Sequence, residues 1–242
     1  PSAARAAARR RAARHPRARI AMSRPKVFIT GAAAGLGEAL ARHYAARGAV
    51  LGLYARRAAE LARVAAALPA PAVATYAGDV RDEAALAAAG ADFVARHGLP
   101  DIVIANAGVS RGTLTEHPQD LAAFRAVLET NVIGMVATFM PFAAAMQRAR
   151  AGALVGIASV AGFRGLAGSG AYSASKSVVM RLTESMAAEL RDKNINVNCV
   201  MPSIIDTPSN RADMPDADPK RWVAPEALAD VILFLASDKA RA

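Results

Sequence analysis

The feature that most constrains the fold is an alternation, from Lys26 onward, of short apolar runs with longer segments of helical periodicity. The short runs are rich in β-branched residues and predict strands at 26–30, 49–54, 72–76, 101–105, 153–158 and 196–201. The longer Ala- and Leu-rich segments predict helices at 36–47, 57–68, 83–96, 121–147, 171–191 and 225–236. Strands and helices that alternate in this way indicate successive βαβ units.

Such units predict a single α/β domain. Right-handed crossovers would place helices on both faces of one doubly wound parallel sheet. The 242 residues, of which 54% are apolar and 21% charged, are enough to bury one continuous core. Folds of this kind bind ligands at the carboxyl ends of the strands, so we expect the functional residues directly after strands.

Composition excludes several classes of protein. Cys199 is the only cysteine, which rules out an internal disulfide and a four-cysteine zinc site. We therefore expect no metal site and a reducing, cytoplasmic location. The longest apolar stretches, such as 153–163 and 227–236, are shorter than the roughly 20 residues that cross a bilayer, so we expect a soluble protein with no membrane partner.

The charge is concentrated in residues 1–24, which hold eight arginines and no acidic residue. The chain carries a formal net charge of +10, but residues 25–242, with 22 basic and 20 acidic residues, carry only +2. Residues 1–24 have no spaced large apolar side chains to bury, which predicts a disordered basic arm. A nucleic-acid or membrane contact, an organelle transit peptide and a regulatory arm are alternatives to a plain extension upstream of a start at Met22. We favour the plain extension and expect no nucleic-acid partner, because the arm lacks aromatic residues that stack on bases.

A glycine-rich turn, Thr-Gly-Ala-Ala-Ala-Gly-Leu-Gly at 30–37, joins the first predicted strand to the first predicted helix. Glycines let the backbone turn tightly and approach a diphosphate, whose charge is met by the free N–H groups at the helix start. The spacing differs from the common Gly-x-Gly-x-x-Gly fingerprint, and glycine turns often serve no ligand. The turn favours a dinucleotide site without establishing one by itself.

The residues after the second predicted strand favour a phosphorylated cofactor. An acidic residue at this point would accept hydrogen bonds from an unphosphorylated adenosine ribose. Here Ala55 leaves room and Arg56 supplies positive charge for a 2′-phosphate, unless Arg56 and Arg57 merely begin a solvated helix. We therefore expect NADP(H) to be preferred, with NAD(H) as the alternative.

Two further turns follow the third and fourth predicted strands. Asp79, in Gly-Asp-Val, can accept a hydrogen bond from an adenine amino group. The small residues of Asn-Ala-Gly at 106–108 allow a cofactor to lie against the chain. Asn, Asp and Gly also dominate plain turns, so neither motif is decisive alone.

Three side chains form a candidate catalytic group. Ser159 follows the fifth predicted strand, and Tyr172 and Lys176 stand four apart at the start of a helix, on one face. Lys176 would lower the pKa of Tyr172 from about 10, so that Tyr172 can exchange a proton with a substrate oxygen held by Ser159. Asn131 interrupts a long apolar helix and indicates a bent helix that holds a water. Taken singly, the Tyr/Lys pair is a common amphipathic spacing and Ser159 an ordinary loop hydroxyl.

In their order and intervals these motifs resemble the short-chain dehydrogenase/reductase family over residues 26–238. The resemblance implies a Rossmann-like domain over 25–242 and an enzyme that transfers hydride between a nicotinamide cofactor and a carbonyl or alcohol substrate. It also implies a homo-oligomer, a dimer or tetramer, formed through the helices at 121–147 and 171–191. The alternative is a catalytically silent dinucleotide-binding sensor or scaffold, but such proteins typically lack the Tyr or the Lys that this chain has.

The resemblance also implies residue roles. Tyr172 would be the general acid/base, Ser159 would steady the substrate oxygen, Lys176 would lower the Tyr172 pKa and hold the nicotinamide ribose, and Asn131 would keep a water in a proton relay. Thr207, in a segment at 202–207 similar to the family's Pro-Gly-x3-Thr, would bond the nicotinamide carboxamide. The expected cofactor-binding residues are Thr30, Gly31, Gly35, Leu36, Gly37, Arg56, Asp79, Val80, Asn106, Ala107, Gly108, Tyr172, Lys176, Pro202, Ile205 and Thr207.

Three features depart from the family pattern. Ser203 stands where glycine is usual, Ala34 replaces the basic residue of many NADP-preferring relatives, and the chain ends at Ala242, before the final edge strand of most relatives. The substrate and the direction of the reaction are not readable from the sequence. The side chains expected to line the substrate pocket are Arg111, Phe163, Arg164 and Met214, with the two arginines as either ligands of an acidic substrate or solvated rim residues.

Overall fold

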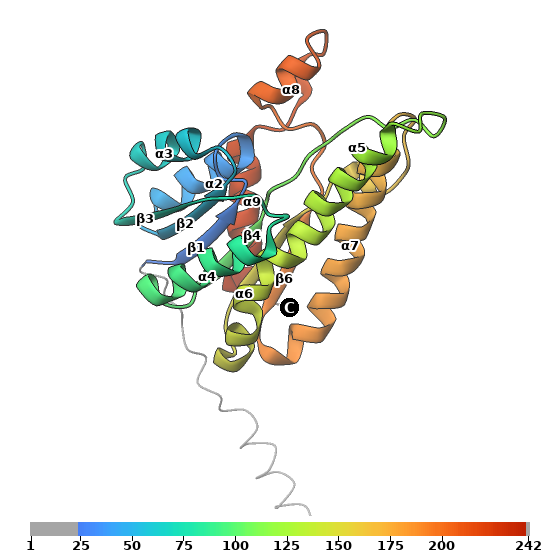
Figure 1. The fold of residues 1–242 in the computed structure, drawn as a ribbon. Helices are drawn as coiled ribbons and strands as arrows, with labels where there is room; N and C mark the ends of the chain where they lie inside the picture. The colour runs from blue at the N-terminus through green and yellow to red at the C-terminus, as the bar shows by residue number, and fades with distance from the viewer. Residues whose placement is uncertain (1–23, 241–242) are drawn as a thin grey trace, which may run out of the picture.

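The six apolar runs form the strands of one parallel sheet, in a computed structural model that describes residues 24–240 (Figure 1). The strands are β1 (Lys26–Thr30), β2 (Val50–Ala55), β3 (Ala72–Ala77), β4 (Ile102–Ala105), β5 (Ala153–Ile157) and β6 (Asn196–Val200). They are ordered β3-β2-β1-β4-β5-β6, and every neighbouring pair is parallel. The order reverses between β1 and β4, which confirms the doubly wound α/β fold. The predicted disordered arm, apart from Arg24, lies outside the described residues.

Helices cover both faces of this sheet. They are α2 (Gly35–Ala45), α3 (Ala58–Ala66), α4 (Glu83–His97), α5 (Asp120–Leu128), α6 (Gly134–Ala149), α7 (Gly170–Leu190), α8 (Pro208–Asp213) and α9 (Pro225–Leu235). The helices α2, α3 and α9 pack on one face, and α4, α6 and α7 pack on the other. Figure 1 shows α5 running alongside α7, with which it is in contact.

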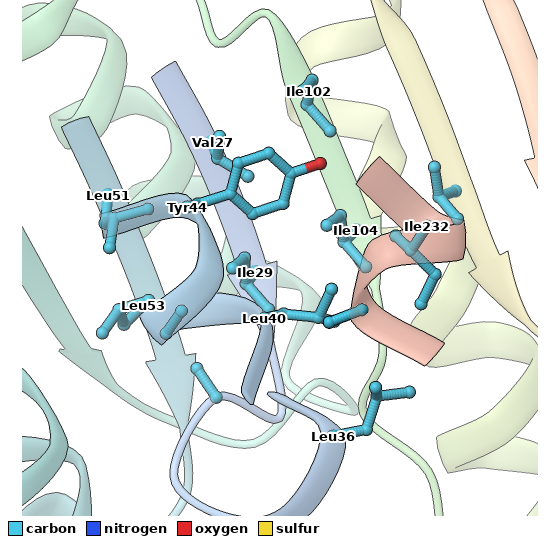
Figure 2. Packing of buried hydrophobic residues seen from close by; sticks show 14 of the residues in the cluster. Val27, Ile29, Leu36, Leu40, Tyr44, Leu51, Leu53, Ile102, Ile104 and Ile232 are labelled. Carbon is cyan, nitrogen blue, oxygen red and sulfur yellow. The ribbon is translucent and has the colours of Figure 1, made fainter. Parts of the chain in front are cut away.

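Side chains alternate between two cores along the central strands. In β1, Val27 and Ile29 enter the core beneath α2 and α9, whereas Phe28 enters the core beneath α4 and α6. Because both faces are covered, the strands are apolar throughout, as is usual for parallel sheets. Figure 2 shows the first of these cores, in which Tyr44 of α2 lies among apolar side chains of the sheet and Ile232 of α9.

The helix predicted at 121–147 is not one regular α-helix. The helix α5 ends at Leu128, a π-helical turn occupies Glu129–Ile133, and α6 begins at Gly134. A π-turn inserts extra backbone into a helix and is often found at functional sites. The irregularity falls at Asn131, the residue that indicated a bend in the sequence.

The run from Asp120 to Ala149 is also the one helical segment among residues 24–240 that is long and apolar enough to cross a membrane by length and composition. Half of its most apolar window is buried inside the protein. Its α6 part packs against α4, and its α5 part packs against α7. Core helices pass the same test, and these contacts identify the run as part of the helical layer of the fold.

Strand β6 is one of the two outer strands of the sheet within the described part of the chain, and β3 is the other. Its asparagines hold the end of α9: the Nδ2 of Asn196 donates to the carbonyl of Leu235 at 2.7 Å, and that of Asn198 donates to the same oxygen at 3.2 Å. Carbonyls in the last turn of a helix have no intrahelical partner, so these bonds stabilise the helix end. The described residues form the single domain that the sequence predicts, and its predicted bounds of 25–242 stay a prediction.

Candidate active site

The glycine turn after β1 brings the backbone of two loops into direct contact. Gly31 and Gly35 have φ angles of +69° and +55°, in the left-handed region that other residues rarely adopt. A Cβ atom on Gly37 would lie 2.1 Å from the carbonyl oxygen of Gly31, and one on Gly31 would lie 2.8 Å from Cα of Ala107. Side chains at these positions would push the turn away from the loop after β4, so glycine is needed for the two loops to pack at the start of α2.

Asn106 ties this turn to the end of β4. Its Nδ2 donates to the carbonyl oxygens of Thr30 at 3.0 Å and Gly31 at 3.2 Å. The backbone N–H of Ala107 donates to the hydroxyl of Thr30, which is fully buried. The contact lies between β1 and β4, where the strand order reverses and where doubly wound sheets bind ligands. Thr30 and Asn106 therefore hold together the backbone of the two loops that border the crevice between β1 and β4.

One pocket gathers most of the predicted cofactor-binding residues of the first half of the chain. The predicted residues that line it are Gly31, Leu36, Gly37, Arg56, Asp79, Val80, Asn106, Ala107 and Gly108. The predicted set of cofactor-binding residues did not include the other lining residues, which are Ala33, Ala34, Tyr54, Ala55, Arg57, Gly78, Val109 and Thr130. All of these are chain neighbours or near neighbours of residues that the motifs did identify, and that adjacency was the available signal.

The predicted residues after β6 lie beside this pocket rather than in its lining. Thr207 approaches the glycine turn, because a Cβ on Gly35 would lie 3.1 Å from its methyl group. Its hydroxyl also caps α8 by accepting from the N–H of Asn210 at 3.2 Å. Ile205 forms an isolated bridge with Val223. The roles of Pro202, Ile205 and Thr207 toward a cofactor stay predictions.

Charged side chains gather where β2 and β3 end. Arg56 is largely exposed, and its Nη1 lies 3.9 Å from Oδ2 of Asp79. The same carboxylate accepts from Nη2 of Arg81 at 2.7 Å and from Nε of Arg81 at 3.1 Å. Arg57 also lines the pocket and pairs with Glu60 of α3. The pocket lining therefore contains a second cation, Arg57, beside the predicted Arg56.

Ser159 stands directly after β5 and is buried. Its hydroxyl accepts from the N–H of Ala161 at 3.2 Å, which caps the short 3₁₀-helix Val160–Gly162. The same hydroxyl donates to the carbonyl of Pro202 at 3.3 Å. These two contacts place Ser159 between the ends of β5 and β6, with its side chain in a defined position.

Tyr172 and Lys176 lie in the first two turns of α7, as the spacing predicted. Lys176 is buried, its Nζ donates to the carbonyl of Ile157 at 2.7 Å, and it lies 5.5 Å from the centre of the Tyr172 ring. Burial lowers the pKa of Lys176 to about 8. Burial also raises the pKa of Tyr172 above its ordinary value, while a hydrogen bond with Ser159 acts in the opposite direction. Burial is the largest influence on the pKa of Tyr172 in this structure, and the predicted lowering of that pKa by Lys176 stays a prediction.

Asn131 sits in the π-helical turn and is almost fully buried. Its Oδ1 accepts from the N–H of Val109 at 2.8 Å, and its Nδ2 donates to the carbonyl of Val109 at 2.9 Å. Its Nδ2 also donates to the hydroxyl of Ser175, which donates in turn to the carbonyl of Tyr172. The amide thus joins the loop after β4 to the first turns of α7. The predicted role of Asn131 in holding a water stays a prediction.

Gly108 connects the pocket to the candidate catalytic group. A Cβ atom there would lie 3.3 Å from Oδ1 of Asn131 and 3.6 Å from Nζ of Lys176. Gly108 itself lines the pocket that the glycine turn begins. Residues from the first strand of the sheet to α7 therefore form one continuous site.

The side chains expected to contact substrate do not line the pocket described above. Arg111 and Arg164 are exposed, Phe163 is 65% exposed, and Met214 is half-buried. Their contact with a substrate stays a prediction. Within residues 24–240, no three His, Cys, Asp or Glu side chains are grouped so that they could hold a metal ion.

Known proteins are similar to this chain along most of its length. A family model described as short chain dehydrogenase matches residues 25–218. The cis-4-hydroxycyclohexanecarboxylate dehydrogenase of Sinomonas cyclohexanicum is 38% identical over 224 residues, which cover 88% of this chain and 89% of the relative. The structure of L-sorbose reductase from Gluconobacter frateurii, complexed with NADPH and L-sorbose, is 26% identical with a TM-score of 0.82, and covers 90% of this chain and 92% of that one.

A third relative was solved with the other nicotinamide cofactor. The structure of a 3-oxoacyl-[acyl-carrier protein] reductase with bound NAD from Brucella melitensis is 32% identical with a TM-score of 0.77, and covers 90% of this chain and 86% of that one. Members of the family use nicotinamide cofactors and act on alcohol or carbonyl groups. The family model matches most of this chain, and the relatives cover a similar share of it. The chain therefore belongs to the short-chain dehydrogenase/reductase family of oxidoreductases.

Proposed function

We propose that the protein is an NADP(H)-preferring oxidoreductase that transfers hydride between nicotinamide and a carbonyl or alcohol carbon, with Tyr172 as the general acid/base. The observation that carries this proposal is the continuity of the site. Gly108 lies in the lining of the dinucleotide pocket and next to both Asn131 and Lys176. A cofactor in that pocket would therefore reach the side chains that exchange protons.

The residues present fit a dinucleotide. The glycine turn lines the pocket at the start of α2, where the free N–H groups of a helix would meet a diphosphate, and Arg56 and Arg57, which also line the pocket, supply positive charge. A bound nicotinamide cofactor supplies or accepts the hydride. Lys176 would hold its ribose, and Thr207, beside Gly35, would bond its carboxamide.

The proton step belongs to Tyr172. Its raised pKa keeps the phenol protonated at neutral pH, so in the reductive direction Oη donates a proton to the substrate oxygen as negative charge develops there. In the oxidative direction the phenol must first lose its proton, and the same oxygen, as phenolate, then accepts the proton of the alcohol. Ser159 would donate a hydrogen bond to the substrate oxygen and hold it beside Tyr172. Asn131, through its link to Ser175, fixes the helix turn that carries Tyr172.

The cofactor preference rests on the end of β2. Ala55 places no acidic side chain there, and the mostly exposed guanidinium of Arg56 is available to a 2′-phosphate. A charge-assisted hydrogen bond contributes about 1.5–3 kcal/mol, and we expect the lower half, roughly 10- to 40-fold in affinity, because salt screens an exposed arginine. The relatives do not decide the preference, since one was solved with NADPH and another with NAD.

Calorimetric titration with NADPH and NADH tests this preference. We expect tighter binding of NADPH, a gap that narrows as salt rises, and selective loss of NADPH affinity in Arg56→Ala. The matched control is Arg96→Ala, which removes an exposed arginine paired with Asp92 on α4, outside the pocket. Equal affinities in the unmodified protein, or an NADPH affinity that Arg56→Ala does not change, would overturn the preference.

A panel of ketones and secondary alcohols, followed by nicotinamide absorbance in both directions, tests the reaction itself. The panel should include cyclic hydroxy acids, because one relative is named for a hydroxycyclohexanecarboxylate and because Arg111 and Arg164 are exposed cations on loops near the site. Turnover of at least one member supports the proposal. Saturable cofactor binding without turnover of any member would favour a silent dinucleotide-binding protein instead.

We further propose that the protein acts in the cytoplasm as a homo-oligomer, either a dimer or a tetramer. The helical layer formed by α5, α6 and α7 exposes large apolar side chains, including Leu121, Met140 and Val178. An exposed apolar surface of this kind is typical of an interface. Light scattering should report at least a dimer, and a monomer at all concentrations would contradict this proposal.

A further inference from the structure

The carboxylate of Asp79 lies between two arginines at the edge of the pocket. Its Oδ2 is 2.7 Å from Nη2 of Arg81 and 3.9 Å from Nη1 of Arg56. Its Oδ1 accepts from both Nε and the backbone N–H of Arg81, at 3.1 and 3.0 Å. Both oxygens of Asp79 are therefore engaged by Arg81, whereas the approach to Arg56 is too long for a hydrogen bond.

This asymmetry matters because Arg56 is the arginine assigned to the 2′-phosphate. A carboxylate paired with Arg56 would occupy its donors and would repel a phosphate nearby. Two parallel N–H···O bonds from one guanidinium form the stronger arrangement, and they hold Asp79 in a fixed orientation. Arg81 also lowers the pKa of the Asp79 carboxyl more than any other group does, so the charge of Asp79 is fully developed at neutral pH.

We propose that Arg81 is a positioning residue for cofactor discrimination, which keeps the Asp79 carboxylate away from Arg56 and so leaves Arg56 free for a 2′-phosphate. The inference deepens the proposed function and rests on it for the identity of the ligand. Arg81 does not line the dinucleotide pocket, so its effect passes through Asp79. No sequence motif indicated this role.

The other charged groups around Arg81 do not replace Asp79. Oε2 of Glu129, at the start of the π-helical turn, is 3.8 Å from Nη1 of Arg81, and Glu129 is more exposed than Asp79. Arg57 on the other side is paired with Glu60. The unpaired charge that appears when Arg81 is removed would therefore be that of Asp79, at the closest acidic position to Arg56.

The probes for this inference are 5′-AMP and 2′,5′-ADP (adenosine 2′,5′-bisphosphate), which differ only in the 2′-phosphate and take no part in hydride transfer. The quantity measured is the ratio of their dissociation constants by calorimetry. We expect Arg81→Gln to reduce the preference for 2′,5′-ADP by about fivefold, the upper range for an exposed charge pair. In Asp79→Asn/Arg81→Gln the carboxylate is absent, so the preference should return to within about twofold of that of the unmodified protein.

Arg96→Gln is the matched control, because it removes one arginine from an ion pair with Asp92 in the last turn of α4, away from the strand ends that form the pocket. It should leave the preference unchanged. A preference that Arg81→Gln leaves within twofold of the unmodified value would overturn the inference. A preference that stays low in the double variant would also overturn it, because Arg81 would then act on the phosphate itself.

The experiment separates this inference from the proposed function. If Arg81→Gln lowers the preference for 2′,5′-ADP but the unmodified protein turns over no carbonyl or alcohol, the proposed oxidoreductase function is refuted and the role of Arg81 is intact. Turnover with NADPH together with an unresponsive preference would refute the role of Arg81 alone. Absence of binding of either nucleotide to the unmodified protein would refute both.

Discussion

Replacing Gly37 with alanine tests whether the turn after β1 is built for close backbone approach. The new Cβ would lie 2.1 Å from the carbonyl oxygen of Gly31 and 2.7 Å from Nδ2 of Asn106. Neither neighbour is the free end of a flexible side chain, because the first is backbone and the second donates to the carbonyls of Thr30 and Gly31. The backbone of the turn must therefore move away from the loop after β4.

The expected cost follows from these contacts. Over-packing costs about 1–3 kcal/mol, and weakening a hydrogen bond of Asn106 costs about 1 kcal/mol more. Alanine in a helix regains up to about 1 kcal/mol relative to glycine. The free energy of unfolding should fall by about 2 kcal/mol, which lowers Tm by roughly 4–8 °C in a domain of this size.

Thermal unfolding monitored by circular dichroism, with and without saturating NADPH, measures the loss of stability and the loss of stabilisation by the cofactor. Gly37→Ala should also lower NADPH affinity at least about tenfold, because the displaced turn no longer presents its N–H groups to a diphosphate. Gly165→Ala is the control, since a Cβ at Gly165 meets nothing within 4 Å and its backbone is not left-handed. A Gly37→Ala protein with unchanged Tm and unchanged NADPH affinity would refute the reasoning.

Two further predictions concern buried polar groups. The hydroxyl of Tyr44, in the core that Figure 2 shows, is buried and has no hydrogen-bond partner among the described residues. Replacing Tyr44 with Phe should therefore raise the free energy of unfolding by about 1 kcal/mol. A Tm lowered by more than 2 °C would contradict this prediction. The pKa of Lys176 is lowered to about 8 by burial, so between pH 8 and about 10 the unfolded chain binds more protons and stability rises with pH. Relative to Lys176→Met, the unmodified protein should gain about 1.5 kcal/mol between pH 8 and 9.5 in urea titrations, and parallel pH profiles of the two proteins would contradict a lowered pKa.

Local patterns in the sequence were enough to predict the sheet and most of its helices. Strands buried on both faces are short apolar runs, and the six observed strands begin and end within one residue of the predicted ranges. The six-residue helix α8 was missed, because so short a segment shows no periodicity. The π-helical turn was indicated only indirectly, by an amide at Asn131 within an apolar helix.

Contacts between side chains of different helices, strands and loops were harder to predict. A spacing of four residues placed Tyr172 and Lys176 on one face of a helix, but it did not show that Nζ of Lys176 would donate to Ile157. It also did not show that burial would dominate the pKa of the phenol. In the same way, nothing in the turn after β3 indicated that Arg81 would fold back onto Asp79 and compete with Arg56. These features depend on the directions of side chains in the folded protein.

The central claim is that Tyr172 moves the proton that accompanies hydride transfer, and single-turnover kinetics of Tyr172→Phe test it most directly. The substitution removes one hydroxyl and keeps the ring, so NADPH should bind within about threefold of its affinity for the unmodified protein. Tyr76→Phe is the control, because its hydroxyl bonds Asp92 outside the pocket. On a substrate of the unmodified enzyme, the account predicts a hydride-transfer rate lowered by about 10²- to 10⁴-fold in Tyr172→Phe and unchanged in Tyr76→Phe. A rate in Tyr172→Phe close to that of the unmodified enzyme would contradict it.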